Sequence, residues 1–511
     1  MAHYVGDLWW VRLGLQRGLA AIYLVAFAST LAQCKALLGE RGLLPLRDLV
    51  RATRFLETPS IFHLRSSDGF VRAVAACGVV LSLVALAGLS EAGPLWLSVL
   101  VWLTLWALYL SIVSVGQDFY AFGWESMLLE AGFFASFLGP SSMAVSVIPV
   151  LLLRWVLFRV ELGAGLIKLR HDRCWRELTC LYFHYETQPL PNPLSWYFHH
   201  LPRWMHRASV LVSHVVQLAA PFGLLAPQPF ASIAGGLLVF HQLWLIVSGN
   251  YSWLNWLTVV LGISALSIPA APLVALHARP EGYDAGALVL LGVVVALSIR
   301  PALNLASKHQ AMNRSYNVLH LVNAYGAFGT VTRKRFEVVL EGTDAEDPRS
   351  ESARWREYPC RAKPGDVART PPIVAPYHLR LDWLLWFLPF GAQAYGGRVV
   401  TLGYELWFLR LVERLLEADR PVLRLLRADP FEGRAPRFVR ARYYRYEFTS
   451  WQERRTTKAW WRRTLLGDYL PPTSLADVRR RLQATAPGGA QPGTDPAAAG
   501  SQAPERQRAG G

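Results

Sequence analysis

Charged residues are scarce in this chain. They make up 17% of its 511 residues, against about 25% in an ordinary soluble domain. Cysteine is rare as well, with 5 residues, which excludes a secreted scaffold held together by disulfides. Hydrophobic residues make up 53% of the chain and aromatic residues 12%, and that much apolar surface excludes disorder for most of it. The composition disfavours a soluble one-domain enzyme and indicates that much of the chain is solvated by lipid.

The positive charge is concentrated in the second part of the chain. Residues 1–300 contain 19 Lys and Arg against 15 Asp and Glu, whereas residues 301–511 contain 33 against 21. A basic region beside a membrane is attracted to anionic head groups by about 1 kcal/mol per basic residue. No nucleic-acid-binding motif is present, so we expect membrane lipids and no nucleic acid as partners. Only 6 of the 52 basic residues are Lys, and this preference for Arg favours a bacterial origin.

Eight apolar runs are long enough to cross a membrane, whose hydrocarbon core takes about 20 helical residues. They lie near residues 16–33, 73–90, 95–115, 144–168, 208–226, 231–248, 253–273 and 286–303. A ninth run, near 124–139, is short and carries Glu125 and Glu130, so it fits a full span, a re-entrant helix or an interfacial helix. We therefore predict a polytopic α-helical membrane bundle of about 8–9 spans over residues 1–304.

Two stretches depart from this apolar pattern. Residues 169–207 are rich in His, Trp, Tyr and Pro and predict an ordered cap over the bundle. Residues 305–483 predict a mainly β, α+β domain outside the membrane. Within it we expect a hairpin of strands at 336–343 and 353–362, an amphipathic segment at the membrane interface over 376–391, a helix over 403–428 and a strand over 436–451. Residues 484–511 are rich in Ala, Gly, Pro and Gln and predict a disordered tail.

Three charged residues form a stripe within one predicted span. Arg154, Glu161 and Lys168 are seven residues apart and therefore lie on one face of a helix, with about 10 Å between neighbours. That separation excludes direct pairing, so their partners must come from other helices, cavity water or the cap. Glu125 and Glu130 are the candidates. Three interpretations remain open: an ion network that fixes helix packing, a polar pocket for a ligand or a reaction, and side chains that extend from the helix ends to the membrane surface.

The residues with chemical reactivity lie mainly in the cap. Cys174 and Cys180 are six residues apart, which leaves a disulfide, two free thiols and metal ligation open. His184 and Glu186 could act as an acid–base pair. The histidines have no metal-site spacing, and the sequence contains no P-loop and no nucleophile elbow. We therefore predict no metal site, no cofactor and no standard catalytic centre.

Several segments resemble the lipase maturation factor family. They cover residues 115–138, 152–202, 312–343, 355–366 and 375–387, in the order found in the family. The most specific motifs are CWRELTC (174–180), HYETQPLPNP (184–193), NAYGAFG (323–329) and RLDWLLWF (380–387). The residues that match the family signature, without an assigned role, are Trp175, His184, Tyr185, Glu186, Pro189, Asn323, Tyr325, Gly326, Gly329, Glu341, Asp382 and Trp383.

The resemblance implies a polytopic membrane protein that helps secreted lipases reach their active folded state, with folding clients as partners and no catalytic residue. It implies the endoplasmic reticulum membrane for a eukaryotic protein, with the C-terminal domain in the lumen. A bacterial protein would lie in the cytoplasmic membrane. The basic residues of 35–72 alone would place that segment in the cytoplasm, which is opposite to the orientation that the family implies.

Two functional hypotheses follow. In the first, a non-catalytic maturation factor holds its clients with basic and aromatic residues of the C-terminal domain, namely Trp355, Tyr358, Tyr443, Tyr444, Tyr446, Trp451, Trp460 and Trp461. In the second, an intramembrane enzyme acts on a lipid or polypeptide through a charged pocket around Arg154, Glu161 and Lys168.

Overall fold

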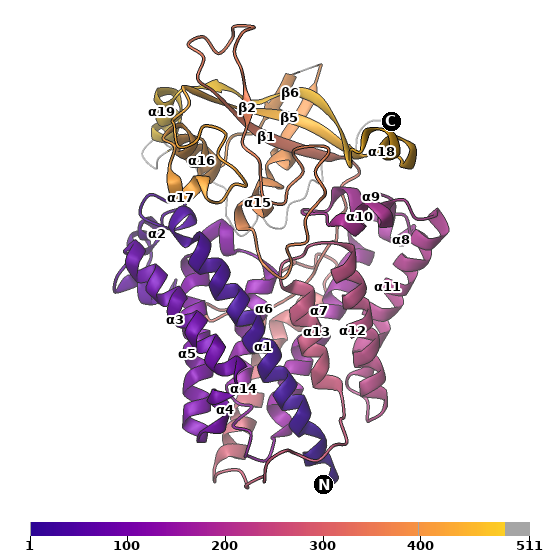
Figure 1. The fold of residues 1–511 in the computed structure, drawn as a ribbon. Helices are drawn as coiled ribbons and strands as arrows, with labels where there is room; N and C mark the ends of the chain where they lie inside the picture. Colours follow the sequence, from indigo (N-terminus) through magenta and orange to yellow (C-terminus); the bar gives the residue numbers. More distant parts are fainter. Residues whose placement is uncertain (1, 397, 486–511) are drawn as a thin grey trace.

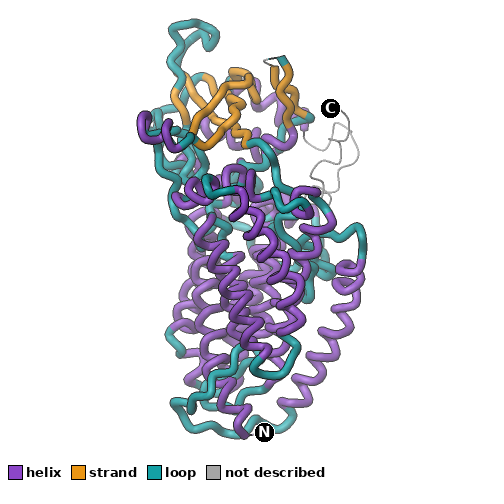
Figure 2. The backbone as a smooth tube through the Cα atoms, turned by 90° about the vertical axis from the view of Figure 1, so that its right-hand side faces the viewer, coloured by secondary structure: helices purple, strands orange, loops and turns teal. Residues whose placement is uncertain are grey.

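The computed structural model describes residues 2–396 and 398–485, and in it a long bundle of helices carries a strand-bearing region at one end (Figures 1 and 2). The N-terminus lies at the opposite end of the bundle (Figure 1). The bundle helices are α1 (Ala2–Leu37), α3 (Asp68–Leu86), α5 (Leu95–Val115), α6 (Gly123–Ala135), α7 (Val147–Arg170), α11 (Arg203–Gly223), α12 (Phe230–Ser248), α13 (Leu254–Gly262) and α14 (Tyr283–Ala306), with short α2 (Leu46–Ala52) and α4 (Leu89–Ala92) between them. From residue 486 on, the predicted tail falls outside the described residues.

Within the described part of the chain, five helices are long and apolar enough to cross a membrane. They are α1 from Leu8 on, α3, α5, α12 and α14. Helices α6 and α13 have only 13 and 9 residues, against the roughly 20 that a span requires. Helix α7 is long enough but carries five charged side chains. The predicted membrane bundle is therefore present, and length and composition support five of the 8–9 predicted spans.

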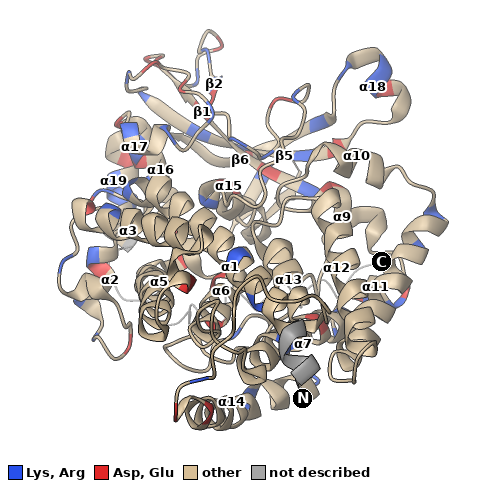
Figure 3. Ribbon diagram, turned by 60° about the horizontal axis from the view of Figure 1, so that its bottom comes forward, with Lys and Arg blue, Asp and Glu red and all other residues tan. Residues whose placement is uncertain are grey.

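The outer surface of the bundle is apolar. Ile233, Leu237 and Phe240 of α12 are exposed, as are Val289 and Val295 of α14. Charged residues are frequent around the strands and rare along most of the bundle helices (Figure 3). Soluble proteins seldom expose large contiguous apolar patches, so lipid is the natural cover for this surface. The chain is an integral membrane protein.

Residues 169–207, which we call the cap, lie between the bundle and the strands. They fold into three short helices, α8 (Arg173–Arg176), α9 (Leu181–Thr187) and α10 (Pro193–His199). A capping box starts α10, because the Asn192 side chain accepts from the backbone N–H of Ser195 at 2.9 Å while Ser195 Oγ accepts from the backbone N–H of Asn192 at 2.9 Å. On the strand side, Trp196 Nε1 donates to the carbonyl of Thr449 at 3.0 Å. The cap therefore contacts the strand-bearing region directly.

The strand-bearing region is built on an antiparallel sheet in the order β2-β1-β5-β6. Its strands are β1 (Arg335–Thr343), β2 (Arg356–Glu357), β5 (Phe438–Phe448) and β6 (Trp461–Thr473), and a separate hairpin consists of β3 (Ala392–Tyr395) and β4 (Arg398–Thr401). Val338 pairs with Tyr443 in the centre of β1 and β5. The strands predicted at 336–343 and 436–451 are confirmed, and the predicted hairpin closes with only two residues of β2.

Helices α15 (Arg380–Leu385), α16 (Leu406–Leu416), α17 (Arg420–Leu423), α18 (Trp451–Thr457) and α19 (Leu475–Thr485) accompany the sheet. The helix predicted over 403–428 is confirmed as α16 and α17. The prediction that 376–391 lies at the membrane interface is wrong for α15, because all six of its residues are buried. One continuous apolar core runs from the bundle into this region, so α15 packs against protein on both sides, whereas Phe387 and Phe390 after it are exposed.

Candidate functional site

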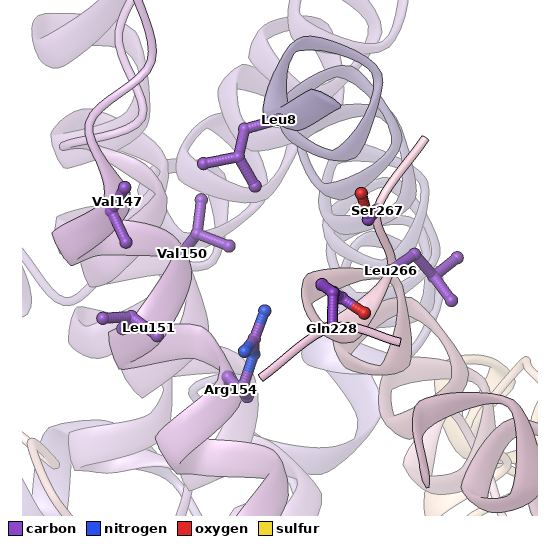
Figure 4. A pocket seen from close by; sticks show the side chains of 8 residues that line it. All are labelled: Leu8, Val147, Val150, Leu151, Arg154, Gln228, Leu266 and Ser267. Carbon is purple, nitrogen blue, oxygen red and sulfur yellow. The ribbon is translucent and has the colours of Figure 1, made fainter. Parts of the chain in front are cut away.

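The charged stripe of α7 is divided among separate sets of partners. Arg154 donates to the carbonyl of Ser264 at 2.6 Å and to that of Leu224 at 3.2 Å. Its guanidinium borders a cavity of about 30 Å³, whose other lining residues are Leu8, Val147, Val150, Leu151, Gln228, Leu266 and Ser267 (Figure 4). Arg154 thus faces helix ends and loops at the end of the bundle away from the strands.

Glu161 and Lys168 are bridged by one glutamine. Gln217 of α11 donates from Nε2 to Glu161 at 3.0 Å and accepts from Lys168 Nζ at 2.7 Å. Gln242 of α12 donates to the other oxygen of Glu161 at 2.6 Å. Lys168 Nζ also lies 4.9 Å from the centre of the Trp175 ring, which is a cation–π contact. The structure therefore links two of the three stripe residues, and joins both to the cap through Trp175.

Glu130 of α6 forms a buried ion pair with Arg159 of α7. The segment that follows the bundle covers this ion pair and donates hydrogen bonds to Glu130. Tyr325 donates its hydroxyl to Glu130 at 2.8 Å, and the backbone N–H of Asn323 donates to the same carboxylate at 3.1 Å. Two signature residues of the NAYGAFG motif thus complete the hydrogen bonding of a charge inside the bundle.

Glu125 of α6 finds its partner in the strand-bearing region. Arg380 of α15 pairs with it at 2.7 Å, and both side chains are fully buried. Tyr109 of α5 donates to the second oxygen of Glu125, and Arg380 also donates to the carbonyl of Phe119 at 2.7 Å. The prediction that these two glutamates are partners of the charged stripe of α7 is therefore wrong, because Glu130 pairs with Arg159 of the same helix and Glu125 pairs with Arg380. The signal for Arg380 was a basic residue at the start of the mainly apolar motif RLDWLLWF.

Arg335, at the start of β1, binds the cap to the sheet, and the sequence contained no motif that pointed to it. It donates to the carbonyls of Glu186 at 3.0 Å, Gln188 at 2.5 Å and Pro189 at 3.0 Å. It also pairs with Glu337 at 2.5 Å, with both side chains fully buried. A guanidinium that satisfies three carbonyls and one carboxylate fixes the position of β1 relative to the HYETQPLPNP motif.

His184 and Glu186 contact different partners, so the structure does not bring them together as an acid–base pair. His184 Nε2 lies 2.8 Å from the Tyr251 hydroxyl, and burial lowers the pKa of the imidazole to about 3. Glu186 accepts from the backbone N–H of Phe448 at 2.5 Å. Burial, followed by the charge of Glu447, raises the pKa of the Glu186 carboxyl to about 7, although the Phe448 N–H opposes that shift.

The raised pKa of Glu186 predicts a pH-dependent stability. Between pH 4.5, its ordinary pKa, and about pH 7, the folded protein holds this proton more tightly than the unfolded chain does. Raising the pH through this window therefore lowers the free energy of unfolding, by on the order of 3 kcal/mol at most. Glu186→Gln should remove this component from melting curves recorded at pH 5 and pH 8. The control is Glu177→Gln, which changes an exposed glutamate of the same cap and should melt like the wild type at both pH values. If Glu186→Gln keeps the pH dependence of the wild type, Glu186 is not the group that causes it.

Cys174 and Cys180 are joined by a disulfide in the cap, with Cα atoms 4.8 Å apart. Beside it, the Asp172 carboxylate accepts from the backbone N–H of Cys174 at 3.0 Å and pairs with Arg333 at 2.8 Å. Since Arg333 lies two residues before β1, the bridged loop is tied to the start of the sheet.

The remaining signature residues lie where the bundle, the cap and the strands meet. Trp175 Nε1 donates to the carbonyl of Phe328 at 2.8 Å, and Gly329 accepts from the backbone of Asp172 at 3.2 Å. Asp382 accepts from the backbone N–H groups of Ala362 at 2.5 Å and Lys363 at 3.1 Å. The ring centres of Tyr185 and Phe198 lie 5.4 Å apart, and those of Trp383 and Trp124 lie 5.0 Å apart. Glu341 pairs with Arg440 at 2.6 Å within the sheet. Gly326 lies where an added Cβ would come within 3.1 Å of Met312 and 3.3 Å of Ile167.

Both parts of this assembly match known families. Residues 10–270 match the lipase maturation factor transmembrane domain, and residues 321–471 match the lipase maturation factor C-terminal domain. The chain belongs to the lipase maturation factor family. It is 39% identical to lipase maturation factor 1 of Homo sapiens over 93% of this chain and 90% of that protein. It is 29% identical to lipase maturation factor 2 of Homo sapiens over 90% of this chain and 82% of that protein.

The mouse relative, lipase maturation factor 1 of Mus musculus, is 38% identical over 93% of this chain and 89% of that protein. These relatives are mammalian, so they lend no support to the bacterial origin suggested by the Arg-rich composition. No solved structure matches the chain. The contacts described above are therefore those of this member of the lipase maturation factor family alone.

Most of the aromatic residues that were candidates for client binding lie in the core of this family member. Tyr358, Tyr443, Tyr446, Trp460 and Trp461 are buried, because they fill the space between the sheet, the cap and the helices. A client-binding surface made of all eight aromatics is therefore excluded. The three that reach the surface, wholly or in part, are Trp355, Tyr444 and Trp451.

Proposed function

We propose that this protein is a membrane-embedded factor that helps exported lipases reach their active, folded and assembled state, without a catalytic step of its own. The observation that carries the proposal is the match of both the bundle and the strand-bearing region to lipase maturation factors. Folding clients, lipases first, and membrane lipids are its partners. The cap and the buried charge pairs hold the strand-bearing region firmly on the bundle, which suits a protein that presents a binding surface beside a membrane.

We place the strand-bearing region in the compartment where exported proteins fold. The Cys174–Cys180 disulfide supports this orientation, because disulfides persist in the lumen of the endoplasmic reticulum or in the periplasm and are rare in the cytosol. The basic segment 35–72 lies on the same side, where Arg41 pairs with Glu417 at 2.7 Å. Since Arg41 is engaged by the folded region, its charge is a weak guide to topology. For a eukaryotic protein the membrane is that of the endoplasmic reticulum.

We also propose that residues 1–304 form the membrane domain, including the cap, and that residues 305–483 form the domain outside it. The short or charged helices α6, α7, α11 and α13 complete the eight or nine spans together with the five apolar ones. The pairing of Arg159 with Glu130 and the hydrogen bonds of Glu161 and Lys168 support this arrangement. They allow α7 to remain in the bilayer because its charges face other helices and not lipid.

The exposed apolar residues around the β3–β4 hairpin form the candidate client surface. Phe390, Tyr395, Val400 and Leu402 are exposed, and Leu402 is 99% exposed. Incompletely folded proteins expose apolar surface of their own, so this surface offers them a contact that their native state would not need. The hairpin has only two strands, and it therefore also offers backbone groups to an extended segment.

Site-specific photocrosslinking in native membranes tests this function. A photoreactive residue at Leu402 should capture an immature exported lipase, identified by mass spectrometry, because the probe lies on the proposed client surface. The same probe at Arg349, in the exposed loop between β1 and β2, should capture much less. Recovery of only lipids and neighbouring membrane proteins from Leu402 would contradict the proposal.

The alternative function is an intramembrane enzyme that acts on a lipid or polypeptide. The observation in its favour is the buried unit of Glu161, Gln217 and Lys168. Lys168→Met and Glu161→Gln separate the alternatives when they are combined with the Leu402 probe. Loss of lipase maturation at normal abundance and with unchanged crosslinking would favour the enzyme, whereas loss of the folded protein would favour a structural network.

A further inference from the structure

A small open cavity lies where the end of α1 meets the strand-bearing region. Its volume is about 40 Å³, and its lining residues are Ala32, Gln33, Arg361, Tyr377, Leu379, Leu381, Asp382, Arg424 and Leu425. A water-sized group takes about 10–15 Å³ of such space. The cavity therefore has room for about three such groups, which is enough for the two non-bridging oxygens of a phosphodiester.

Two arginines, Arg361 and Arg424, line this cavity, and Arg369 and Arg427 lie close to them. Arg361 is held in place by the segment that follows α17, since it donates to the carbonyls of Arg424 at 2.5 Å and Leu426 at 3.3 Å. Arg369 donates to the carbonyl of Cys360 at 2.9 Å, and burial, followed by the nearby charge of Arg427, lowers the pKa of its guanidinium. Within residues 2–396 and 398–485, none of Arg361, Arg369, Arg424 and Arg427 forms an ion pair, and the side chains of Arg424 and Arg427 donate no hydrogen bond.

An incompletely covered stripe of α1 leads to the same cavity. Ala21, Leu24, Ala28 and Ala32 are partly or fully exposed, and their spacing of three or four residues places them on one face of the helix. Lys35 is exposed one turn further on. Since α1 is long and apolar enough to cross the membrane, this face is open to the acyl chains of lipids, and it ends at the arginines.

The neighbouring helix α3 places the cavity at the membrane surface. A Cβ on Gly78 of α3 would touch the Phe27 ring, and a Cβ on Gly39 would lie 2.8 Å from Asp68 Oδ1. The two helices are antiparallel, and Gln33 is midway between Phe27 and Gly39 in the chain. Gln33 therefore lies at about the same height along the bundle as Arg72, which is between Asp68 and Gly78. Arg72 is exposed and is the last charged residue before the uncharged remainder of α3, so this level is that of the lipid head groups.

We propose that this cavity binds the phosphate group of a membrane phospholipid, between Arg361 and Arg424, while an acyl chain follows the exposed stripe of α1. Guanidinium groups suit phosphate oxygens because they donate paired hydrogen bonds with full charge. The carboxylate of Asp382 also borders the cavity, but it accepts the backbone N–H groups of Ala362 and Lys363. A free phosphate ion has the same head-group chemistry, and the α1 stripe favours the lipid.

Native mass spectrometry of the full-length protein tests the proposal. The protein, purified in detergent, is incubated with mixed micelles of phosphatidylcholine and phosphatidylglycerol, and the retained lipid is counted. The wild type should retain one phospholipid. Arg424→Gln should retain it about five- to tenfold more weakly, and Arg361→Gln/Arg424→Gln more weakly still, because each change removes a charged donor. The control is Arg354→Gln, an exposed arginine of the β1–β2 loop, which should bind like the wild type.

Retention by the double variant equal to that of Arg354→Gln would overturn the proposal, as would equal retention of diacylglycerol, which lacks the phosphate. A separate titration with inorganic phosphate distinguishes the sources. Binding of inorganic phosphate with no retention of phospholipid would overturn the lipid assignment. Arg361 helps to hold the segment that follows α17. If the double variant elutes abnormally on size exclusion, Arg424→Gln is the deciding variant, because the Arg424 side chain holds no other residue.

Discussion

Arg380→Met should lower the free energy of unfolding by about 3–5 kcal/mol. The substitution keeps the apolar volume of the side chain but leaves Glu125 buried without a cation. Arg380 and Glu125 are 2.7 Å apart and fully buried, so no solvent can replace the lost partner. Thermal unfolding of the detergent-solubilised protein, followed by fluorescence-detected size exclusion, measures the loss.

Two further variants make this prediction specific. Glu125→Gln/Arg380→Met removes both charges and should recover part of the lost stability, since the cost of the single variant is mainly that of an unpaired carboxylate. Arg398→Met removes an exposed arginine from β4 and should change the melting temperature little. If Arg380→Met melts like Arg398→Met, the pair does not join the two regions.

Arg335→Ala should release the strand-bearing region from the cap while the bundle stays folded. The variant removes the donor to three carbonyls and one of the two cations that pair with Glu337, the other being Lys363, and we expect a local loss of about 3 kcal/mol. Hydrogen–deuterium exchange should rise in residues 184–190 and in β1, with little change in α12 and α14. If release also removes the Leu402 crosslink to the client, the fixed position of the strand-bearing region is required for maturation.

Arg333→Ala is the matched control for this experiment. Arg333 lies two residues earlier and pairs with Asp172, but 43% of its side chain is exposed. Exposed ion pairs contribute about 1 kcal/mol or less, so exchange in the cap should rise only slightly. Equal exchange in the two variants would show that Arg335 has no special part in joining the cap to the sheet.

The residues that only the tertiary structure brings together carry the largest of these effects. Glu125 and Arg380 are 255 residues apart in the chain, whereas the sequence made Glu125 a candidate partner of the charged stripe of α7. The periodicity of α7 placed Arg154, Glu161 and Lys168 on one face, but it contained no information on what faces them. The groups that face this stripe are Gln217, Gln242 and two backbone carbonyls. Glutamines and carbonyls occur in any helix or loop, so nothing in the sequence marks these ones as partners.

The sequence by itself determined the membrane bundle, the main strands and the family. Long apolar runs are stable only in lipid, alternating residues specify a strand from local preference, and motifs such as NAYGAFG are contiguous. The tertiary structure alone decided which aromatics are buried, where α15 lies and how the cap joins β1 through Arg335. Local patterns specify which face of an element is apolar, whereas the partner of that face, or of a charge on it, depends on how distant segments pack.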